Sequence, residues 1–344
     1  MLLVAAVVAI IAVALVFDFL NGFHDAANSI ATVVSTRVLS PTYAVAWAAF
    51  FNFVAAFVGG VKVANTMGKG ILDFERLRAQ GSTEVLVVIF AALMGAIVWN
   101  IVTWWWGLPS SSSHALTGGL IGATLPSLGA SGLVLGGIGK IALFILIAPL
   151  MGMVLGTVMM LGTTWVVHWT KATPLKADKW FRRLQLVSSG FYSFGHGSND
   201  AQKVMGIIAV VLFGTVWKGQ PFHVQWWMIL SCHAAIALGT FFGGWRIVRT
   251  MGHSLTKLQP IGGFCAETGG GVTLLVSASL GIPVSTTHTI TGAIVGVGST
   301  RGARAVQWGV AGRIVWAWVF TIPMAGAIAA FFYLLALALV TAVS

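Results

Sequence analysis

Two short stretches of this chain combine a proline, a run of hydroxyl side chains and a histidine within sequence that is otherwise apolar. They read GLPSSSSHALTGG over residues 107–119 and GIPVSTTHTITG over residues 281–292. A proline suits the first turn of a helix and a hydroxyl beside it suits an N-cap, so each stretch predicts a helix start. A helix start in apolar surroundings leaves about four backbone N–H groups unpaired, and these donors attract an anion. The hydroxyl groups that would add donors are those of Ser110, Ser111, Ser112, Ser113, Ser285, Thr286 and Thr287.

The ligand predicted by this chemistry is an anion that many neutral donors can surround, and a tetrahedral oxyanion fits. The alternative is that the hydroxyls bond back to carbonyl groups four residues earlier in their own helices. The two stretches align Pro109 with Pro283 and His114 with His288, and this second occurrence argues against the alternative. His114 and His288 are accessory candidates, which could cap the helix, contact the ligand or fill a polar pocket.

Four of the eight acidic residues, Asp18, Asp25, Asp200 and Glu267, lie in apolar sequence. A carboxylate inside a membrane is costly and is by default a functional-site hypothesis. Glycine and polar residues surround Asp25 and Asp200, which predicts an unwound segment before each acid. Carbonyl oxygens exposed there, together with the carboxylate and with Asn28 on the same helix face, would suit a small cation. For Asp18 and the accessory candidate Glu267, structural and functional roles are equally supported.

The composition predicts a membrane protein. Hydrophobic residues make up 58% of the 344 residues and charged residues 8%, whereas charged residues make up about 25% of a typical soluble domain. Several apolar runs reach the roughly 20 residues that a helix needs to cross a bilayer. We therefore predict an all-α polytopic protein of the cytoplasmic membrane, folded as one integrated membrane domain.

The net charge of the chain is +11, and five basic residues cluster in one segment, residues 169–184, which is predicted to be a loop. Its basic residues are Lys171, Lys176, Lys179, Arg182 and Arg183. The positive-inside rule places this linker in the cytoplasm. No charged residue precedes Asp18 and none follows Arg313, so we predict that both termini lie outside the cytoplasm. An orientation signal explains the segment better than nucleic-acid binding, which we do not expect.

Three blocks recur in the same order in both halves of the chain. The matched blocks are 22–29 with 197–204, 57–68 with 241–252, and 107–123 with 281–297. We therefore predict an N-terminal repeat over 1–168 and a C-terminal repeat over 185–344. With both termini on one side and the linker on the other, each repeat crosses the membrane an odd number of times. The fold expected is two inverted-topology repeats, each with a broken helix and a re-entrant helical hairpin, with the substrate near the midplane.

Charge explains why such an anion site would need a second ligand. A carboxylate 4 Å from the anion repels it by about 4 kcal/mol at an effective dielectric constant near 20. A cation or a proton at Asp25 and Asp200 would remove that repulsion, so anion and cation would favour each other's binding. Such coupling is what a symporter needs. No catalytic residue, resident metal or other cofactor is expected.

The residues described above resemble the PiT family of inorganic phosphate transporters over nearly the whole chain. Each half carries a G-x-N-D-x-x-N-like segment, GFHDAANS or GSNDAQKV, and a P-x-S-[ST]-[ST]-H segment, PSSSSH or PVSTTH. The resemblance implies cation-coupled phosphate uptake by an inverted-repeat bundle that is a homodimer. The residues that it implies to be cation-linked are Asp25, Asn28, Asn199 and Asp200. Those that it implies to contact phosphate are Ser111, Ser112, Ser113, Ser285, Thr286 and Thr287.

Two departures from the family pattern concern the coupling ion. His24, an accessory candidate, stands where sodium-coupled members usually carry Asn, and Gln202 and Lys203 stand where they repeat Ala-Asn. Lys203 lies within salt-bridge reach of Asp200 on a helix. Its ammonium group could replace a bound cation or could be only a fixed structural partner. The segment HGSNDAQK resembles the bacterial Pit branch, associated with proton coupling or with uptake of metal–phosphate complexes. We therefore favour protons over sodium and leave open a divalent metal travelling with phosphate.

Other functions fit these residues less well. Another tetrahedral oxyanion such as sulfate would suit the same donors, because hydrogen-bond donors bind an oxyanion whether or not it carries a proton. An anion channel would not need paired acids beside its pore. An intramembrane hydrolase with a serine nucleophile and His114 as base would need one such site rather than two, and the sequence has no Gly-x-Ser-x-Gly elbow.

Overall fold

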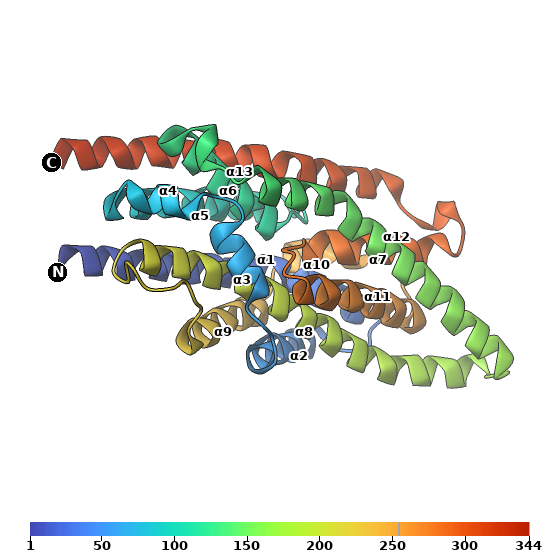
Figure 1. The fold of residues 1–344 in the computed structure, drawn as a ribbon. Coiled ribbons are helices and arrows are strands. Elements are labelled where there is room, and N and C mark those ends of the chain that lie inside the picture. Colours follow the sequence, from blue (N-terminus) through green and yellow to red (C-terminus); the bar gives the residue numbers. More distant parts are fainter. Residues whose placement is uncertain (254, 344) are drawn as a thin grey trace.

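The computed structural model describes residues 1–253 and 255–343, which form helices joined by short loops (Figure 1). The first half contains α1 (Leu2–Ser35), α2 (Pro41–Val54), the 3-10 helix η1 (Ala55–Phe57), α3 (Lys62–Lys69), α4 (Phe74–Ala79), α5 (Ser82–Trp105), α6 (Ser112–Leu128), η2 (Ala130–Gly132) and α7 (Leu135–Trp169). The second half contains α8 (Pro174–Gly214), α9 (Trp226–Phe242), α10 (Trp245–His253), α11 (Pro260–Ser279), α12 (Thr286–Ser299), η3 (Ala303–Ala305) and α13 (Trp308–Val343). The all-helical prediction is confirmed.

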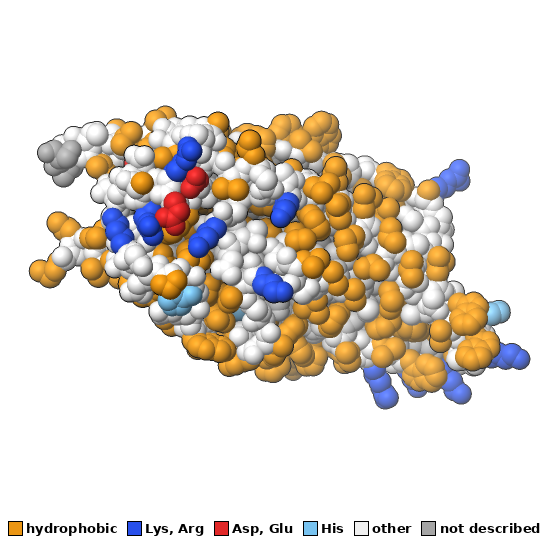
Figure 2. Space-filling view, in the orientation of Figure 1, with side chains coloured by type: hydrophobic (Ala, Val, Ile, Leu, Met, Phe, Trp, Pro, Cys, Tyr) orange, Lys and Arg blue, Asp and Glu red, His pale blue; other side chains and the backbone are white. Residues whose placement is uncertain are grey.

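The lengths and surfaces of these helices fit a membrane. Among the described residues, α1, α5, α7, α11 and α13 are long and apolar enough to cross a bilayer. The bent pairs α2–α3 and α9–α10 would raise the number of spans from five to seven. Figure 2 shows hydrophobic side chains over the surface between two groups of charged side chains. A bilayer around this hydrophobic part accounts for both observations, and the prediction of a polytopic membrane protein is confirmed.

The order of the helices repeats between the two halves. The helices α1, α2, α3, α5, α6 and α7 correspond in sequence order to α8, α9, α10, α11, α12 and α13. Their packing is reciprocal, because α6 packs on α13 while α12 packs on α7, and α1 packs on α9 while α2 packs on α8. Such exchange is what a two-fold relation between the halves requires. The orientation of that axis in the membrane stays a prediction.

Each half contains a broken helix, but at a different place from the one predicted. The helix α1 is continuous through Asp25 and α8 is continuous through Asp200, so the unwound segments predicted before these acids are wrong. The breaks separate α3 from α2 and η1, with a bend of 85°, and α10 from α9, with a bend of 73°. They fall at the glycine pairs Gly59–Gly60 and Gly243–Gly244 of the second repeated block. The polar side chains near the two acids bond to neighbouring helices, so their own helices need no unwinding.

The basic segment over 169–184 is mostly helix rather than loop. The helix α7 ends at Trp169 and α8 already begins at Pro174, with Thr173 as its N-cap. A proline at the first position and a threonine cap favour a helix start, and the exposed basic side chains do not oppose it. Figure 1 shows both termini at one end of the molecule and the α7–α8 turn at the other. This arrangement is the one that an odd number of crossings per half requires, while the side of the membrane that each end faces stays a prediction.

Two helical hairpins, α5–α6 and α11–α12, occupy opposite parts of the molecule along its length (Figure 1). The first helix of each hairpin ends in the same way, with Gly107 at φ +66° and Gly281 at φ +70°. In each, the amide after the glycine donates to the carbonyl five residues earlier, at 2.9 Å. This is the Schellman motif, which glycine adopts without the strain that a side chain would add. The same local geometry therefore turns both hairpins at their tips.

Glycines let each hairpin approach its neighbours closely. A Cβ added at Gly118 or Gly122 of α6 would lie 2.4 Å or 2.0 Å from a carbonyl oxygen of α13, and one at Gly119 would lie 2.3 Å from a carbonyl oxygen of α5. In α12, a Cβ at Gly292 or Gly296 would lie 2.0 Å or 2.2 Å from a carbonyl oxygen of α7. Small residues at such contacts are the usual means by which membrane helices pack.

We expect Gly122→Ala to destabilise the folded protein, because its methyl group would meet the backbone of Gly326. Overpacking costs about 1–3 kcal/mol, so the apparent melting temperature of the detergent-solubilised protein should fall by about 2 °C or more. Gly162→Ala is the matched control, since a Cβ there meets nothing within 4 Å. Equal melting temperatures for the two variants would contradict this account of the packing.

Candidate functional site

The tips of the two hairpins each hold the start of a helix. The helix α6 begins at Ser112 with Ser111 as its N-cap, and α12 begins at Thr286 with Ser285 as its N-cap. Each cap hydroxyl accepts a hydrogen bond from the N–H of the histidine three residues later, at 3.2 Å in both tips. The helix starts lie where the sequence predicts them, although the prolines precede the caps instead of lying in the first turn. The first two N–H groups of each helix remain without a cap.

The two tips meet through reciprocal hydrogen bonds. Ser113 Oγ donates to the Val284 carbonyl at 3.5 Å, and Thr287 Oγ1 donates to the Ser110 carbonyl at 3.1 Å. Residues 110 and 113 align with 284 and 287 in the repeated block, so the same contact is made twice with the halves exchanged. The two helix starts are thereby brought to one place in the interior.

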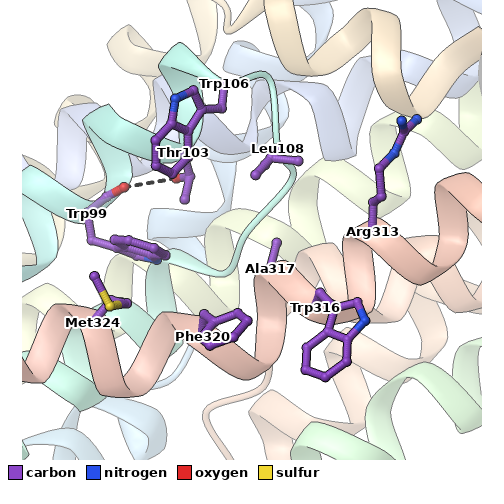
Figure 3. A pocket seen from close by; sticks show the side chains of 9 residues that line it. All are labelled: Trp99, Thr103, Trp106, Leu108, Arg313, Trp316, Ala317, Phe320 and Met324. Atoms are coloured by element: carbon purple, nitrogen blue, oxygen red, sulfur yellow. Dashed lines mark hydrogen bonds between the residues drawn. The ribbon is translucent and has the colours of Figure 1, made fainter.

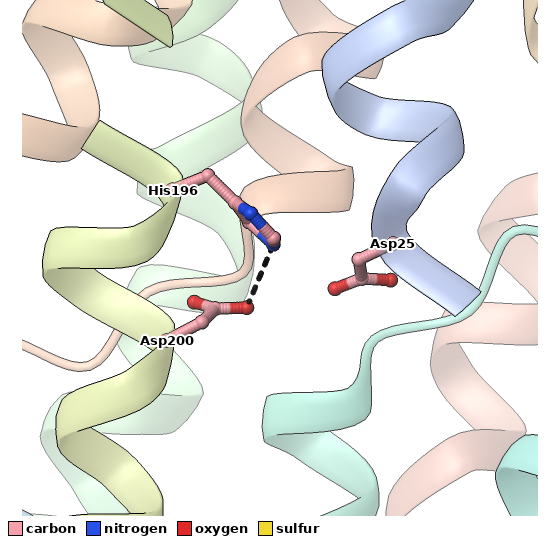
Figure 4. A group of neighbouring side chains, drawn as sticks. All are labelled: Asp25, His196 and Asp200. Atoms are coloured by element: carbon pink, nitrogen blue, oxygen red, sulfur yellow. Dashed lines mark ion pairs between the residues drawn. The ribbon is translucent and has the colours of Figure 1, made fainter. Parts of the chain in front are cut away.

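Asp25 of α1 and Asp200 of α8 lie beside the tips (Figure 4). Thr286 Oγ1 is 3.3 Å from Asp25 Oδ2 and 3.4 Å from Asp200 Oδ2, and its single proton can serve one of them at a time. His196, one turn before Asp200, places Nε2 3.5 Å from Asp200 Oδ2. Asp25, His196 and Asp200 each offer one ligand atom, and these atoms lie within 4.8 Å of one another. All three residues are buried, and together they could hold a cation.

Lys203 is a buried cation between Asp200 and both tips. Its Nζ donates to Asp200 Oδ1 at 2.5 Å, to the Val284 carbonyl at 2.9 Å and also to Ser113 Oγ. The ion pair with Asp200 that the spacing predicts is therefore present. All three ammonium protons have acceptors, which is the condition for a buried ion pair to be stable. Lys203 also brings a positive charge to the helix starts at which an anion is predicted.

The first half presents a neutral side chain at the corresponding position. Asn28, which aligns with Lys203, donates to Thr287 Oγ1 at 2.8 Å and to Thr286 Oγ1 at 3.4 Å. Each of these two side chains therefore reaches the hairpin tip of the other half. The centre is two-fold in its contacts but not in its charge.

His24 and Asn199 are the residues that directly precede the two acids. His24 Nδ1 lies 3.0 Å from Asp25 Oδ1, and its Nε2 lies 3.2 Å from Thr103 Oγ1. Asn199 Nδ2 donates to the Ile282 carbonyl in the second hairpin tip at 3.4 Å. Asp25 therefore has an imidazole partner, whereas Asp200 has an ammonium partner.

The predicted hydroxyl residues and cation-linked residues all come to this centre, but three accessory candidates do not. His114 and His288 lie behind the tips, with ring centroids 4.6 Å apart. Glu267 lies in a separate buried network, in which Thr32 and Ser188 donate to it at 2.6 Å and 2.5 Å. The functional roles of all these residues stay predictions.

His196 and Tyr192 belong to the centre, although the sequence does not single them out. Tyr192 OH donates to the Thr286 carbonyl at 3.0 Å. Tyr192, His196 and Asp200 are spaced by four residues, which places them on one face of a helix. That spacing is the signal from which both residues could have been found.

The centre is closed to solvent, since its most exposed predicted side chain is Ser113 at 6%. A separate groove of about 450 Å³ opens between α5 and α13 (Figure 3). Its lining residues are Trp99, Thr103, Trp106, Leu108, Arg313, Trp316, Ala317, Phe320 and Met324. This lining is mainly apolar, so it does not suit an anion. It reaches the centre through Thr103, which accepts a hydrogen bond from Ser110 Oγ at 2.8 Å.

An all-helical membrane protein with repeated helix order and two hairpins that meet at a closed polar centre has the features of a secondary transporter. The chain belongs to the phosphate transporter family, whose family model matches residues 21–329. The resemblance to the PiT family is therefore confirmed. Because the family consists of transporters, the prediction that the chain is not an enzyme is also confirmed.

Individual relatives match the chain over nearly its full length. It is 59% identical to a probable low-affinity inorganic phosphate transporter of Rhizobium meliloti (strain 1021), in an alignment that covers 95% of each chain. It is 40% identical to a protein of the same description from Bacillus subtilis (strain 168), with 96% and 97% covered. Among solved structures, one described as the sodium-dependent phosphate transporter is similar, with a TM-score of 0.86 and 26% identity over 96% of this chain and 98% of that chain.

We expect Ser111→Ala and Ser285→Ala each to lower stability by about 1 kcal/mol, because each removes the acceptor for an N–H at a helix start. Thermal unfolding of the detergent-solubilised variants measures the effect. Ser131→Ala is the control, since Ser131 is exposed and does not cap these helices. If both cap variants unfold at the temperature of the control, the two serines do not stabilise the tips.

Proposed function

We propose that this chain is a secondary active transporter that carries inorganic phosphate across the cytoplasmic membrane together with a cation, by alternating access. The observation that carries the proposal is the meeting of two helix starts beside Asp25, Asp200 and Lys203. The relatives described as inorganic phosphate transporters support phosphate as the substrate. The similar structure described as sodium-dependent supports a coupled cation.

Phosphate would bind between the hairpin tips. Each helix start contributes two uncapped N–H groups and the positive end of its dipole. The hydroxyl groups beside them are those of Ser112, Ser113, Thr286 and Thr287, and the last three would exchange their present acceptors for phosphate. Ser112 Oγ has no hydrogen-bond partner among the described residues, so it is available to a ligand. Ser111 and Ser285 would act by holding the helix starts in place, and Ser110 by its bond to Thr103.

Charge balance gives Lys203 its role. With neutral histidines, Asp25 and Asp200 carry two negative charges and Lys203 carries one positive charge. Lys203 neutralises Asp200 permanently, so one cation or proton at Asp25 is sufficient to make the centre neutral before phosphate binds. Removing one unit of negative charge about 4 Å from the anion lowers the electrostatic repulsion by about 4 kcal/mol at a dielectric constant near 20. We infer that Lys203 takes the place of one coupling cation.

A proton suits the remaining position at Asp25 better than sodium. His24 presents nitrogen 3.0 Å from Asp25 Oδ1, and sodium is a hard cation that prefers oxygen ligands. A proton can be shared between the ring nitrogen and the carboxylate oxygen across this contact, and it needs no shell of oxygen ligands. Asp25, His196 and Asp200 together would also suit a divalent metal that enters as a complex with phosphate. In that case the metal would be part of the substrate.

The closed centre requires the two halves to move during transport. The repeated helix order and exchanged packing support inverted repeats, and the basic start of α8 supports a cytoplasmic position for the α7–α8 turn. Both termini would then lie outside the cytoplasm.

The long helices α7 and α13 leave surface for lipid and for the second copy of a homodimer. Only 22% of the residues in the apolar stretch of each helix are buried.

Two other functions are less consistent with the centre. Sulfate would find the same donors, but the buried carboxylates can also accept a hydrogen bond from a P–OH group, which sulfate lacks. A site built for such a donor rejects a ligand without one. An open anion channel would need a continuous path, whereas every predicted side chain of this centre is buried.

Uptake of radiolabelled phosphate by proteoliposomes tests the function directly. We expect an inward proton gradient to drive accumulation and excess sulfate to compete weakly. Uptake that responds to neither a proton gradient nor a sodium gradient would contradict symport. Equal competition by sulfate and unlabelled phosphate would contradict the assigned substrate.

We expect Asp200→Asn nearly to abolish driven uptake, because it leaves the Lys203 ammonium without its counter-charge, a loss of about 3–5 kcal/mol for a broken buried pair. Lys203→Asn copies Asn28 of the first half and should make uptake respond to sodium, since Asp200 then needs a cation from solution. Lys179→Asn, an exposed change on α8, is the control. A Lys203→Asn variant with the wild-type rate and ion dependence would show that Lys203 does not act as a tethered cation.

A further inference from the structure

Asp18 is a buried acid that the centre described above does not use. Its side chain has no exposed surface, and neither carboxylate oxygen has a hydrogen-bond partner among the described residues. An ionised carboxylate without partners is strongly disfavoured in a protein interior. Such a group requires a bound cation or a proton. The aligned position in the second half holds Ser193, whose hydroxyl is satisfied by the Ser189 carbonyl at 2.8 Å, so the acid occurs in one half only.

The groups around Asp18 leave it without a cationic partner. Asn21 on α1 and Cys232 on α9 lie beside it, and both are neutral groups. Asp200 and Lys203 face it from α8. The Lys203 ammonium is already bonded to Asp200 and both hairpin tips, and no basic side chain of the described residues forms an ion pair with Asp18. A proton neutralises the carboxylate in this environment without any further ligand group.

Asp18 stands at one end of a polar stripe on α1. The members of this stripe are Asp18, Asn21, Asp25, Asn28 and Thr32, all of them buried. Their spacing of three or four residues places them on one face of the helix. Asp18 lies two turns, about 10 Å, before Asp25. Since α1 begins at the end of the molecule that holds both termini, Asp18 lies on that side of the phosphate site (Figure 1).

We propose that Asp18 is a proton-binding site that takes up the coupling proton on the side of the termini before that proton reaches Asp25, an inference that rests on the proposed function. The carboxylate gains an O–H bond when it binds the proton and loses it on release, and no other bond changes. The neutral form removes one negative charge from the approach to the phosphate site. Phosphate and the proton at Asp18 therefore favour each other's binding, which is the reciprocal coupling that symport needs.

The experiment compares Asp18→Asn and Asp18→Glu in proteoliposomes that contain a trapped pH indicator. Radiolabelled phosphate counterflow reports folding and substrate binding, whereas accumulation under a proton gradient and phosphate-evoked proton influx report coupling. With one proton per phosphate, a gradient of one pH unit raises accumulation about tenfold. Asp18→Asn should keep measurable counterflow and lose that tenfold increase together with the proton influx. Asp18→Glu should retain both, because it keeps a titratable carboxyl group.

Asp178→Asn is the matched control, since Asp178 is an exposed acid that pairs with Arg182 at the start of α8. Proton influx per phosphate in Asp18→Asn equal to that of the control would overturn the inference. It would also be overturned if Asp18→Asn lost counterflow as completely as driven uptake, or if Asp18→Glu failed to restore the coupling. A control protein that takes up no phosphate at all would instead show that the proposed function is wrong.

Discussion

The arrangement depends on placing two carboxylates and an anion site together in an interior that water does not reach. Unpaired charges there are strongly disfavoured, so every negative group needs a fixed partner or a ligand. Lys203 pairs with Asp200 and also reaches both hairpin tips. Asp25 has an imidazole and hydroxyl groups beside it but no ammonium partner, so its charge is left for a mobile ion to neutralise. Under the proposed function, this difference between two aligned acids would couple a cation at Asp25 to the binding of phosphate.

The anion site itself comes from short local motifs that are used twice. A glycine with positive φ turns each hairpin, a serine caps the next helix, and small residues let that helix lie against its neighbours. None of these motifs binds a ligand alone. In the proposed function they bind phosphate together, because the exchanged packing of the two halves brings both helix starts to one point. The hydrogen bonds from Ser113 and Thr287 then fix one tip against the other.

Much of this architecture could be predicted from the sequence because each motif occurs once in each half of the chain. Helix class, hairpin tips and the pairing of Asp25 with Asp200 follow from aligned blocks and hydropathy. The polar residues near the acids predict unwound backbone there, whereas in the structure those side chains bond to other helices. The true breaks lie at glycine pairs, whose effect depends on tertiary packing. The four-residue spacing of His196 and Asp200 places both on one helix face, but the closeness of His196 to Asp25 joins two helices, and no local pattern shows that contact.

The central claim is that both hairpin tips hold one phosphate beside Asp25 and Lys203. Electron cryomicroscopy of the protein in a lipid nanodisc, with and without saturating phosphate, tests it most directly. We expect a single tetrahedral density between the starts of α6 and α12, within hydrogen-bonding distance of Ser112 and Thr286, which disappears in phosphate-free buffer. A phosphate density elsewhere, or tips that stay empty in a sample that transports phosphate, would contradict it.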